Sequence, residues 1–393
     1  MAASATFFVS SSTIFSSSAS NGTSPYSNLL LYQLRNYTVN GQSVATQNNG
    51  NKYPNPALKP VKISEFEVGL NLAFLANRLT FDMAYYIKNT KDDIAVVSTS
   101  SASGYSSKVA NVGEIRNNGF EFMVDAYPIR SKSFQWNTTF NFAYNNSEVK
   151  NLGEGVDRLS IDGASSRQGG VTVYNIVGQP YGELIGYKYK RNAQGQIILK
   201  DGLPQHADSQ ESLGNGVYKL TGGWNNSFKY KDFTLSFLID FKFGAKIFSG
   251  TNLNLYSDGL HKNTLVGRDD PTAKYVFPGV NEDGSPNTTA VYAQEYYGAI
   301  VSNNIAEEFT YKADFIKLRE LSLSYTFPKS ILSSLKVVKG LSVSLIARNL
   351  WTIKKYVDNI DPESSINNTN GQGLELNGYP TTRNIGFNVN VKF

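Results

Sequence analysis

Carboxylate side chains are the residues of this sequence whose positions first suggest catalysis. A pair of acidic side chains can act as general acid and base, as in glycoside hydrolysis, and six carboxylates fall on polar faces of alternating segments: Glu65, Glu67, Asp82, Glu121, Asp125 and Asp240. The same pattern is typical of charges that line a watery interior and are balanced by Lys and Arg. We favour this second interpretation, because nothing singles out one pair. The sequence therefore predicts no catalytic residue and no enzyme.

The sequence has few residues of the types that bind metals or cofactors. The chain contains no Cys, and its two histidines, His206 and His261, are predicted to be loop residues exposed to water. The stretch Asn281 to Ser285 has oxygen ligands and a Gly but lacks the spacing of a calcium loop, and Asp269-Asp270-Pro271 is typical of a turn. We expect neither a metal nor a cofactor.

Aromatic side chains are the candidate ligand contacts. Rings in or beside loops can stack on sugar faces, and five aromatics are placed in this way: Trp224, Tyr256, Tyr296, Tyr297 and Trp351. Aromatic girdles at the two interfaces of a membrane explain such residues equally well. The sequence leaves both interpretations open.

The elements that must position these residues are β-strands, because side chains of an extended chain alternate between two faces. In the last stretch, Thr382 to Phe393, apolar residues share one face and Asn and Lys take the other. Similar alternation predicts four hairpins, at 64–74 with 79–88, 119–126 with 134–144, 224–230 with 233–243, and 314–327 with 341–350. A change of phase near Ile316 and Leu318 predicts a bulge. One apolar face and one polar face suit an outer-membrane barrel, with Phe393 as its C-terminal membrane-insertion signal.

The connections between these strands alternate between short and long. Residues 1–62 are predicted to be a polar loop with a possible partial strand at Thr6 to Phe15, and residues 63–393 to be a C-terminal β-barrel segment. We expect its long extracellular loops near 91–115, 146–223, 244–313 and 351–381, with a short turn such as Pro128 to Lys132 at the periplasmic side. This parity places the C-terminus in the periplasm. A β-sandwich would have little use for connections this long.

Composition supports strands and excludes other classes. Of 393 residues, 13% are aromatic and 18% charged, with 33 Gly, which favours strands and turns. The net charge of +5 is spread along the chain, so it does not indicate a nucleic-acid partner. No stretch reaches the roughly 18 apolar residues of a membrane helix, and mean hydropathy is −0.30. No Lys or Arg precedes Arg35, so a basic signal segment is missing. Because the strands number roughly nine, an odd count, we expect the chain to be part of a larger barrel.

From about Asn21 to Phe393 the chain resembles the C-terminal barrel half of the SusC/RagA family of TonB-dependent outer-membrane transporters. The matching residues occur in order along the chain: Asn55-Pro56-Ala57-Leu58-Lys59, Gly113-Glu114-Ile115, Asn118-Gly119-Phe120-Glu121, the run from Phe315 to Pro328, Ala347-Arg348-Asn349-Leu350, Asp361-Pro362-Glu363, and Tyr379-Pro380 with Arg383. Several ordered matches are far more specific than any one of them.

The resemblance implies a large barrel in the outer membrane of a Gram-negative bacterium, of the kind that has 22 strands and a plugged lumen. It implies import of oligosaccharides or peptides, a SusD-like surface lipoprotein as partner, and energy from the TonB complex. The family's plug and TonB-contacting segment precede the barrel and have no counterpart in this sequence. This chain is therefore expected to supply lipid-facing barrel wall and extracellular loops.

Two other functions remain open from the residues alone. The loops at 146–223 and 244–313 suit a passive outer-membrane barrel or a surface adhesion module. An extracellular carbohydrate-active enzyme would need a convergent carboxylate pair at hydrolase separation. Nothing in the sequence indicates such a pair.

Overall fold

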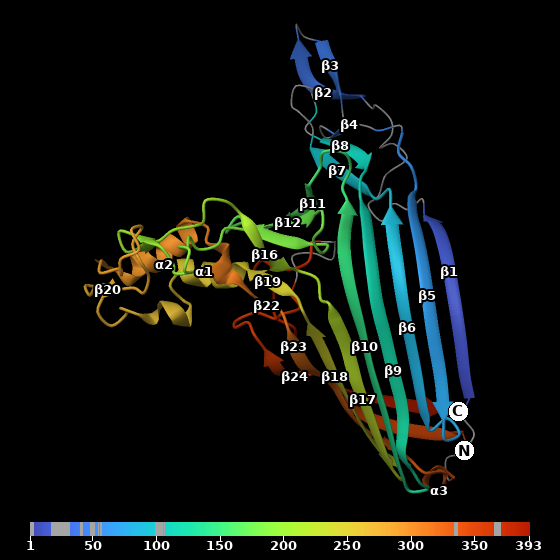
Figure 1. Ribbon diagram of the computed structural model, residues 1–393. Helices are drawn as coiled ribbons and strands as arrows, with labels where there is room; N and C mark the ends of the chain where they lie inside the picture. Colours follow the sequence, from blue (N-terminus) through green and yellow to red (C-terminus); the bar gives the residue numbers. More distant parts are fainter. Residues whose placement is uncertain are drawn as a thin grey trace.

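One antiparallel sheet of ten strands forms the body of the molecule (Figure 1). The computed structural model of the protein describes residues 4–16, 32–39, 42–47, 52–53, 55, 57–98, 105, 107–333, 337–364 and 371–393. In pairing order the strands are β1 (Ser4–Ser16), β5 (Val61–Phe74), β6 (Leu79–Lys91), β9 (Glu114–Arg130), β10 (Phe134–Asn151), β17 (Leu220–Tyr230), β18 (Phe233–Phe243), β23 (Phe315–Thr326), β24 (Gly340–Lys355) and β26 (Asn384–Lys392). All neighbours pair antiparallel. The predicted all-β antiparallel fold is confirmed.

The sheet curves into an open trough (Figure 1). Within the described part of the chain, β1 and β26 are its edge strands. The predicted count of nine strands is wrong, because β1 is a strand of 13 residues that pairs with β5 along its whole length. A Ser-rich strand such as β1 carries little apolar alternation, which is why the pattern showed only part of it. The rest of the stretch predicted as a polar loop at 1–62 is described only in part, and that part includes a hairpin of β2 (Tyr32–Val39) and β3 (Gln42–Gln47), so the loop prediction is wrong there.

Short turns gather at one end of the sheet and long connections at the other (Figure 1). The turn end holds the connections 75–78, 131–133, 231–232 and 327–339, the last with the short helix α3 (Lys329–Leu332). In the first of these turns Leu75, Ala76 and Asn77 all have left-handed backbone. The loop end holds the connections 92–113, 152–219, 244–314 and 356–383. Strand β26 therefore runs towards the turn end, where Phe393 lies.

Two of the irregularities in the strand pairing lie at positions that the sequence analysis singled out. Strand β9 continues to Arg130, so the turn expected from Pro128 begins only at Ser131. The pairing of β9 with β10 shifts between Trp136 and Thr138, which leaves Pro128 in a bulge, where a residue without an N–H is tolerated. On β23 the pairing with both neighbours shifts between Leu318 and Glu320, so Arg319 is the bulged residue. The bulge predicted near Leu318 is confirmed.

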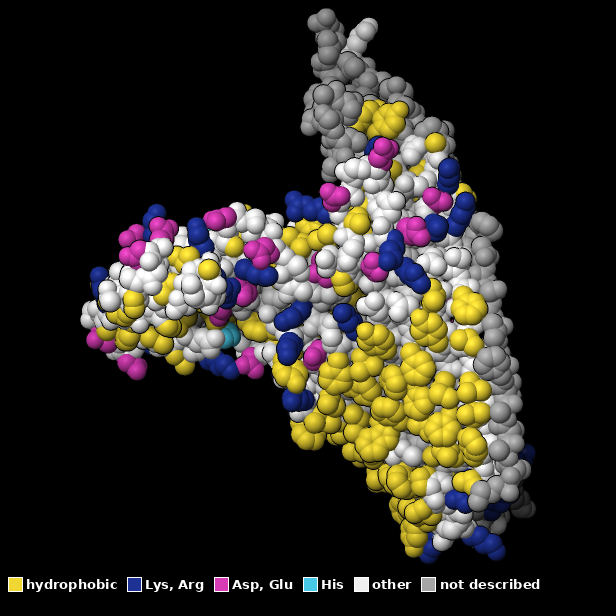
Figure 2. Space-filling view, viewed as in Figure 1, with side chains coloured by type: hydrophobic (Ala, Val, Ile, Leu, Met, Phe, Trp, Pro, Cys, Tyr) yellow, Lys and Arg dark blue, Asp and Glu magenta, His cyan; other side chains and the backbone are white. Residues whose placement is uncertain are grey.

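The outer face of the sheet is apolar over a broad area of the strands that Figure 2 shows from outside. One row of directly opposite residues shows this: Leu72, Phe81, Val124, Phe140, Trp224, Ile239, Leu318 and Trp351. On β18 every second residue from Phe233 to Phe243 is apolar and belongs to this face. At about 3.3 Å per residue and a tilt of about 40°, that run spans about 25 Å, the height of a barrel's lipid-facing band.

The inner face is polar and its side chains satisfy one another. Asp125 accepts hydrogen bonds from Asn137 and Thr139 at 3.0 and 2.7 Å, and Lys88 lies 3.7 Å from Glu65. These contacts between neighbouring strands satisfy part of the polar groups that face the trough. None of the helices among the described residues is long and apolar enough to cross a membrane.

Three of the long connections fold together into one body, which we call the loop module: residues 152–219, 244–314 and 356–383. It contains a four-stranded sheet of β11 (Arg158–Ser165), β12 (Thr172–Ile176), β13 (Glu183–Gly186) and β16 (Glu211–Asn215). A three-stranded sheet joins β19 (Lys246–Ser249), β22 (Thr310–Lys312) and β25 (Leu374–Glu375). The helices α1 (Gly250–Ser257) and α2 (Ala293–Ser302) pack beside them.

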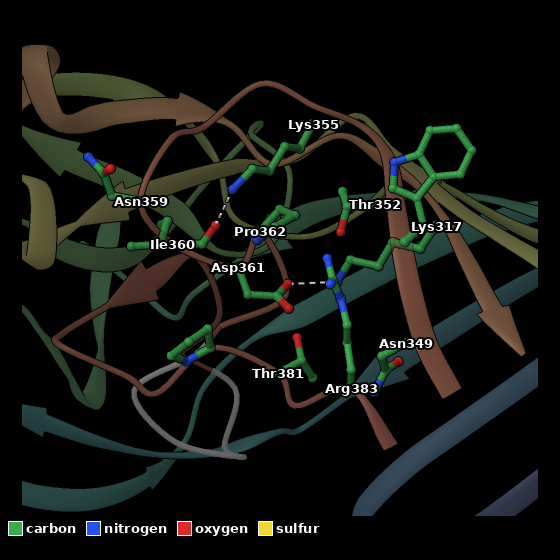
Figure 3. Close-up of a pocket in the computed structure, with 12 residues that line it drawn as sticks. Lys317, Asn349, Thr352, Lys355, Asn359, Ile360, Asp361, Pro362, Thr381 and Arg383 are labelled. Carbon is green, nitrogen blue, oxygen red and sulfur yellow. Dashed lines mark hydrogen bonds and ion pairs between the residues drawn. The ribbon is translucent and has the colours of Figure 1, made fainter. Parts of the chain in front are cut away.

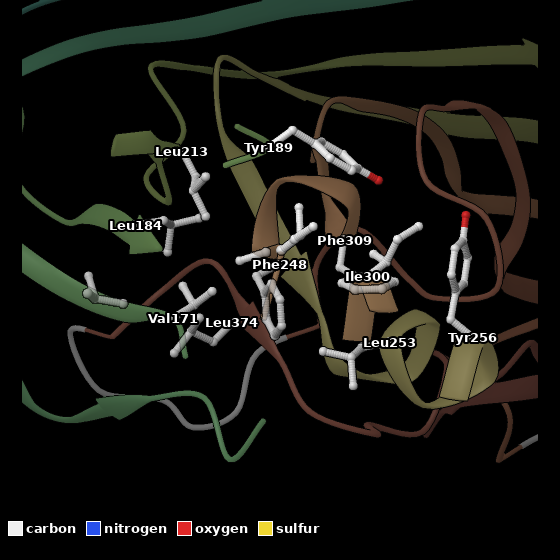
Figure 4. Packing of buried hydrophobic residues seen from close by; sticks show 13 residues of the cluster. Val171, Leu184, Tyr189, Leu213, Phe248, Leu253, Tyr256, Ile300, Phe309 and Leu374 are labelled. Carbon is white, nitrogen blue, oxygen red and sulfur yellow. The ribbon is translucent and has the colours of Figure 1, made fainter. Parts of the chain in front are cut away.

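The largest buried apolar cluster of the described residues lies in this module (Figure 4). Each of the three connections contributes: Val171 and Leu184 come from the first, Phe248 and Phe309 from the second, and Leu374 from the third. Polar and aromatic loops expected from the sequence are therefore a packed domain with its own core. The apolar face of the sheet points outward and its polar face points into the trough. The largest buried core therefore lies in the loop module and not on the sheet.

Candidate functional site

Three of the five aromatics predicted to contact ligand meet in the loop module. Tyr256 is on α1, and Tyr296 and Tyr297 are on α2. The ring of Tyr297 lies 5.7 Å from that of Tyr256 and 5.5 Å from that of Tyr296, and Phe277 stacks on Tyr296 at 3.7 Å. Tyr256 is only 3% exposed, so it supports the cluster from within.

A cavity of about 700 Å³ opens beside this cluster, between the end of α1, the short helix η3 (Lys262–Leu265) and the start of α2. Its wall includes the tyrosines Tyr256, Tyr292 and Tyr297 and the charged residues Asp258, Arg268 and Glu295. Tyr292, Arg268, Asp258 and Glu295 were not predicted from the sequence. The one available signal was the dense run of aromatics at the start of α2.

A carboxylate beneath the cluster holds the tyrosines in place. Glu308, on the short helix η4 (Ala306–Phe309), accepts hydrogen bonds from the hydroxyls of Tyr256 at 2.6 Å and Tyr189 at 2.9 Å. Burial, with the nearby Glu308, raises the pKa of Tyr256 and raises the pKa of Tyr296 to about 12. These hydroxyls stay protonated at neutral pH, so they act as hydrogen-bond groups rather than as bases.

A second cluster ties the loop module to the sheet (Figure 3). Lys317 of β23 is 4% exposed, and its amine lies 2.7 Å from Asp361 and 2.8 Å from Glu363. The Arg319 guanidinium contacts Glu363 at 2.7 Å and also Asp240. Burial would raise the pKa of Glu363, but the hydrogen bonds from Lys317 and Arg319 outweigh it and lower this pKa to about 2. Two of the motifs shared with the SusC/RagA family therefore meet here, the run from Phe315 to Pro328 and Asp361-Pro362-Glu363.

The two predicted tryptophans lie elsewhere. Trp224 is inside β17 and Trp351 inside β24, so neither is in a loop. Both belong to the apolar row on the outer face, and the Trp224 indole N–H donates to the Thr138 hydroxyl at 2.9 Å. The predicted strand began at Trp224, and β17 begins four residues earlier, so Trp224 is not beside the loop. Neither tryptophan lines the cavity beside Tyr297. Trp224, opposite Ile239, lies near the middle of the lipid-facing run on β18 rather than at the level of a girdle.

The remaining candidates are placed as follows. Asp240 pairs with Arg319, and Asp283 accepts hydrogen bonds from Ser285 within a turn. His261 is 4% exposed and packs on Tyr256, so the prediction that it is exposed to water is wrong. His206 lies against Tyr187. Among the described residues no group of three or more His, Cys, Asp or Glu could hold a metal. Phe393 follows β26 and is exposed, and its role as an insertion signal stays a prediction.

Known proteins match this chain along most of its length. The family model described as TonB dependent receptor-like, beta-barrel, matches residues 2–197. TonB-dependent receptor P3 of Formosa agariphila is 28% identical over 405 residues, covering 94% of this chain and 38% of that protein. TonB-dependent receptor SusC of Bacteroides thetaiotaomicron is 24% identical over 360 residues, covering 86% and 32%. The chain thus spans about a third of the length of these curated relatives.

A solved structure has the same fold. A chain in the structure of the RagAB peptide transporter matches with a TM-score of 0.73 at 21% identity, covering 98% of this chain and 40% of that chain. Family model, relatives and fold lead to one conclusion: the chain belongs to the TonB-dependent receptor-like β-barrel family, whose barrels lie in the outer membrane.

Proposed function

We propose that this chain forms barrel wall and ligand- and partner-contacting loops of an outer-membrane TonB-dependent importer of oligosaccharides or peptides. One observation carries the proposal. A packed loop module with a cavity of about 700 Å³ stands at the loop end of a sheet with one apolar and one polar face. Such a wall suits a barrel between lipid and water, and such a module suits capture of a solute before it enters the lumen.

The wall of the cavity suits ligands with many hydroxyl or amide groups. Tyr292 and Tyr297 offer aromatic faces and hydroxyls, Arg268 offers donors, and Asp258 and Glu295 offer acceptors. Aromatic faces contact the C–H faces of sugars or peptide side chains, while the polar groups set orientation. RagAB is a peptide transporter, which supports the peptide alternative.

In this proposal the loop end is extracellular and the C-terminus periplasmic. The SusC-type relative and the RagAB neighbour support a SusD-like surface lipoprotein as the partner that covers the loop module. Coupling to the TonB complex would run through a plug domain. An epitope tag after the exposed Gly284 should be reached by antibody on intact cells, and a tag in the turn at Lys231-Asp232 should not. Labelling of the second tag alone would indicate the opposite orientation, with the turn end of the sheet outside the cell.

Uptake by cells that carry the full-length protein tests the function. The probes are a fluorescent oligosaccharide pool and a fluorescent peptide pool. Arg268→Ala and Tyr297→Ala should each lower uptake of one pool by about tenfold at equal surface abundance, the cost of one strong polar or aromatic contact. Lys200→Ala, an exposed cation on β14 (Leu199–Lys200) outside the cavity wall, is the matched control and should change nothing.

Removal of the TonB complex separates importer from passive barrel. The importer predicts that uptake stops while surface binding of the same pool continues. Entry that continues without the complex would indicate a passive barrel, and unchanged uptake of both pools in Arg268→Ala and Tyr297→Ala would remove the cavity from the path.

A further inference from the structure

A second cavity, of about 260 Å³, lies where the sheet meets the loop module (Figure 3). The pairing of β24 with β26 ends at Arg348 opposite Asn384, and β24 continues alone to Lys355. The segment that leads into β26 diverges from it there. As a result Trp351, which faces outward, and Lys317, which faces the trough, line the same cavity.

The charges around this cavity do not balance. Its wall carries three cations, Lys317, Lys355 and Arg383, and one anion, Asp361, which gives a net charge of +2. Lys317 pairs with Asp361 and also with Glu363, which lies outside the wall and is shared with Arg319. Lys355 donates to the carbonyl of Ile360 at 3.1 Å, while the nearby Asp358 pairs with Lys262. Across the described ranges the Arg383 side chain forms no ion pair or hydrogen bond.

Unbalanced cations in a confined space favour an anionic ligand. A guanidinium beside an ammonium binds phosphate oxygens through several charge-assisted hydrogen bonds, and a phosphomonoester carries a charge of about −1.5 to −2 at neutral pH. That charge would offset the +2 of the wall. The volume excludes an oligosaccharide but admits one phosphate group with its first attached atoms. We propose that this cavity is a phosphomonoester-binding site in which Arg383 and Lys355 hold the anion.

The position of the cavity bears on the source of the phosphate. Trp351 is 57% exposed and belongs to the apolar row of the outer face. On β24 it lies beyond Arg348, the last residue paired with β26, towards the loop end of the strand. Aromatic side chains of this kind mark the level of lipid headgroups. The phosphate could therefore belong to a lipid headgroup beside the wall or to a soluble phosphorylated compound at the trough. The proposal does not depend on the importer function.

Two probes distinguish these sources, both applied to the purified full-length protein. Glucose 6-phosphate, with glucose as the uncharged control, is titrated by calorimetry into protein in uncharged detergent. Phosphatidic acid in phosphatidylcholine nanodiscs is counted on the protein by native mass spectrometry. Binding of the first probe alone indicates a soluble ligand, and binding of the second alone indicates a lipid.

Charge-matched variants assign the binding to this cavity. Arg383→Gln and Lys355→Gln should each weaken binding of the responding probe by about tenfold or more, the loss of one charge-assisted contact. Lys354→Gln removes the same charge one residue away, where the amine lies over the Tyr356 ring and outside the cavity wall, and should stay within about twofold. Failure of both probes to bind, or equal weakening by Lys354→Gln, would overturn the proposal.

Discussion

Glu375 is the residue whose replacement tests the loop module most directly. Its side chain is 0% exposed on β25. Its carboxylate accepts hydrogen bonds from the hydroxyls of Ser249 and Thr251 and from the backbone N–H groups of Thr251 and Gly378, at 2.7 to 3.2 Å. It thereby joins two connections that are far apart in sequence, and it receives the N-terminus of α1, where a negative charge is favourable.

The size of the effect follows from these contacts. Glu375→Ala removes the acceptor of two backbone N–H groups and two hydroxyls inside a buried site. Each hydrogen bond to a charged group contributes about 1.5–3 kcal/mol, but neighbouring contacts are not additive and the hydroxyls can turn elsewhere. A loss of about 3 kcal/mol in the free energy of local opening is therefore expected, which is about a hundredfold in the opening equilibrium.

Hydrogen exchange of the full-length protein in detergent measures that opening. Amides of α1 should lose about a hundredfold in protection in Glu375→Ala, and amides of β17 and β18 should not change, because local opening does not require the sheet to unfold. Glu282→Ala, an exposed carboxylate in the same module, is the control. Unchanged protection of α1 in Glu375→Ala would refute the reasoning that this carboxylate holds the connections together.

Two further predictions concern the sheet and its anchor. Phe237→Lys should sharply reduce the folded protein in the outer membrane, since a Lys near the middle of the lipid face costs about 2–4 kcal/mol, whereas Ser236→Lys on the polar face should be tolerated; equal yields by heat-modifiable gel mobility would contradict the assignment of faces. The pKa of Glu363 lies at about 2 when folded, below its ordinary 4.5, so its stabilising contribution is complete above that ordinary value and is lost as pH falls towards 2. Protease resistance of the connection 356–383 should therefore hold from about pH 8 to about pH 5 and fall only below about pH 4; a loss by pH 6 would rule out this role for Glu363.

The strands of the sheet could be predicted because their signal is local. Lipid on one side and water on the other require a change of polarity at every second residue, so β18 shows its role within 11 residues. The phase change around Arg319 was readable for the same reason. Strand β1 was predicted only in part, because its Ser-rich segments weaken the alternation.

The loop module depended on tertiary structure. Val171, Phe248 and Leu374 form one core although they come from three separate connections, and contacts at such separation leave no periodic pattern in the sequence. The same holds for Glu375 with Thr251, for Lys317 with Asp361, and for the cavity between α1 and α2. The sequence alone therefore determined the wall, whose surroundings act on each residue separately. The position of the cavity and of the buried charged contacts became clear only from the tertiary structure. A cavity forms where segments distant in sequence meet, and their polar side chains then satisfy one another.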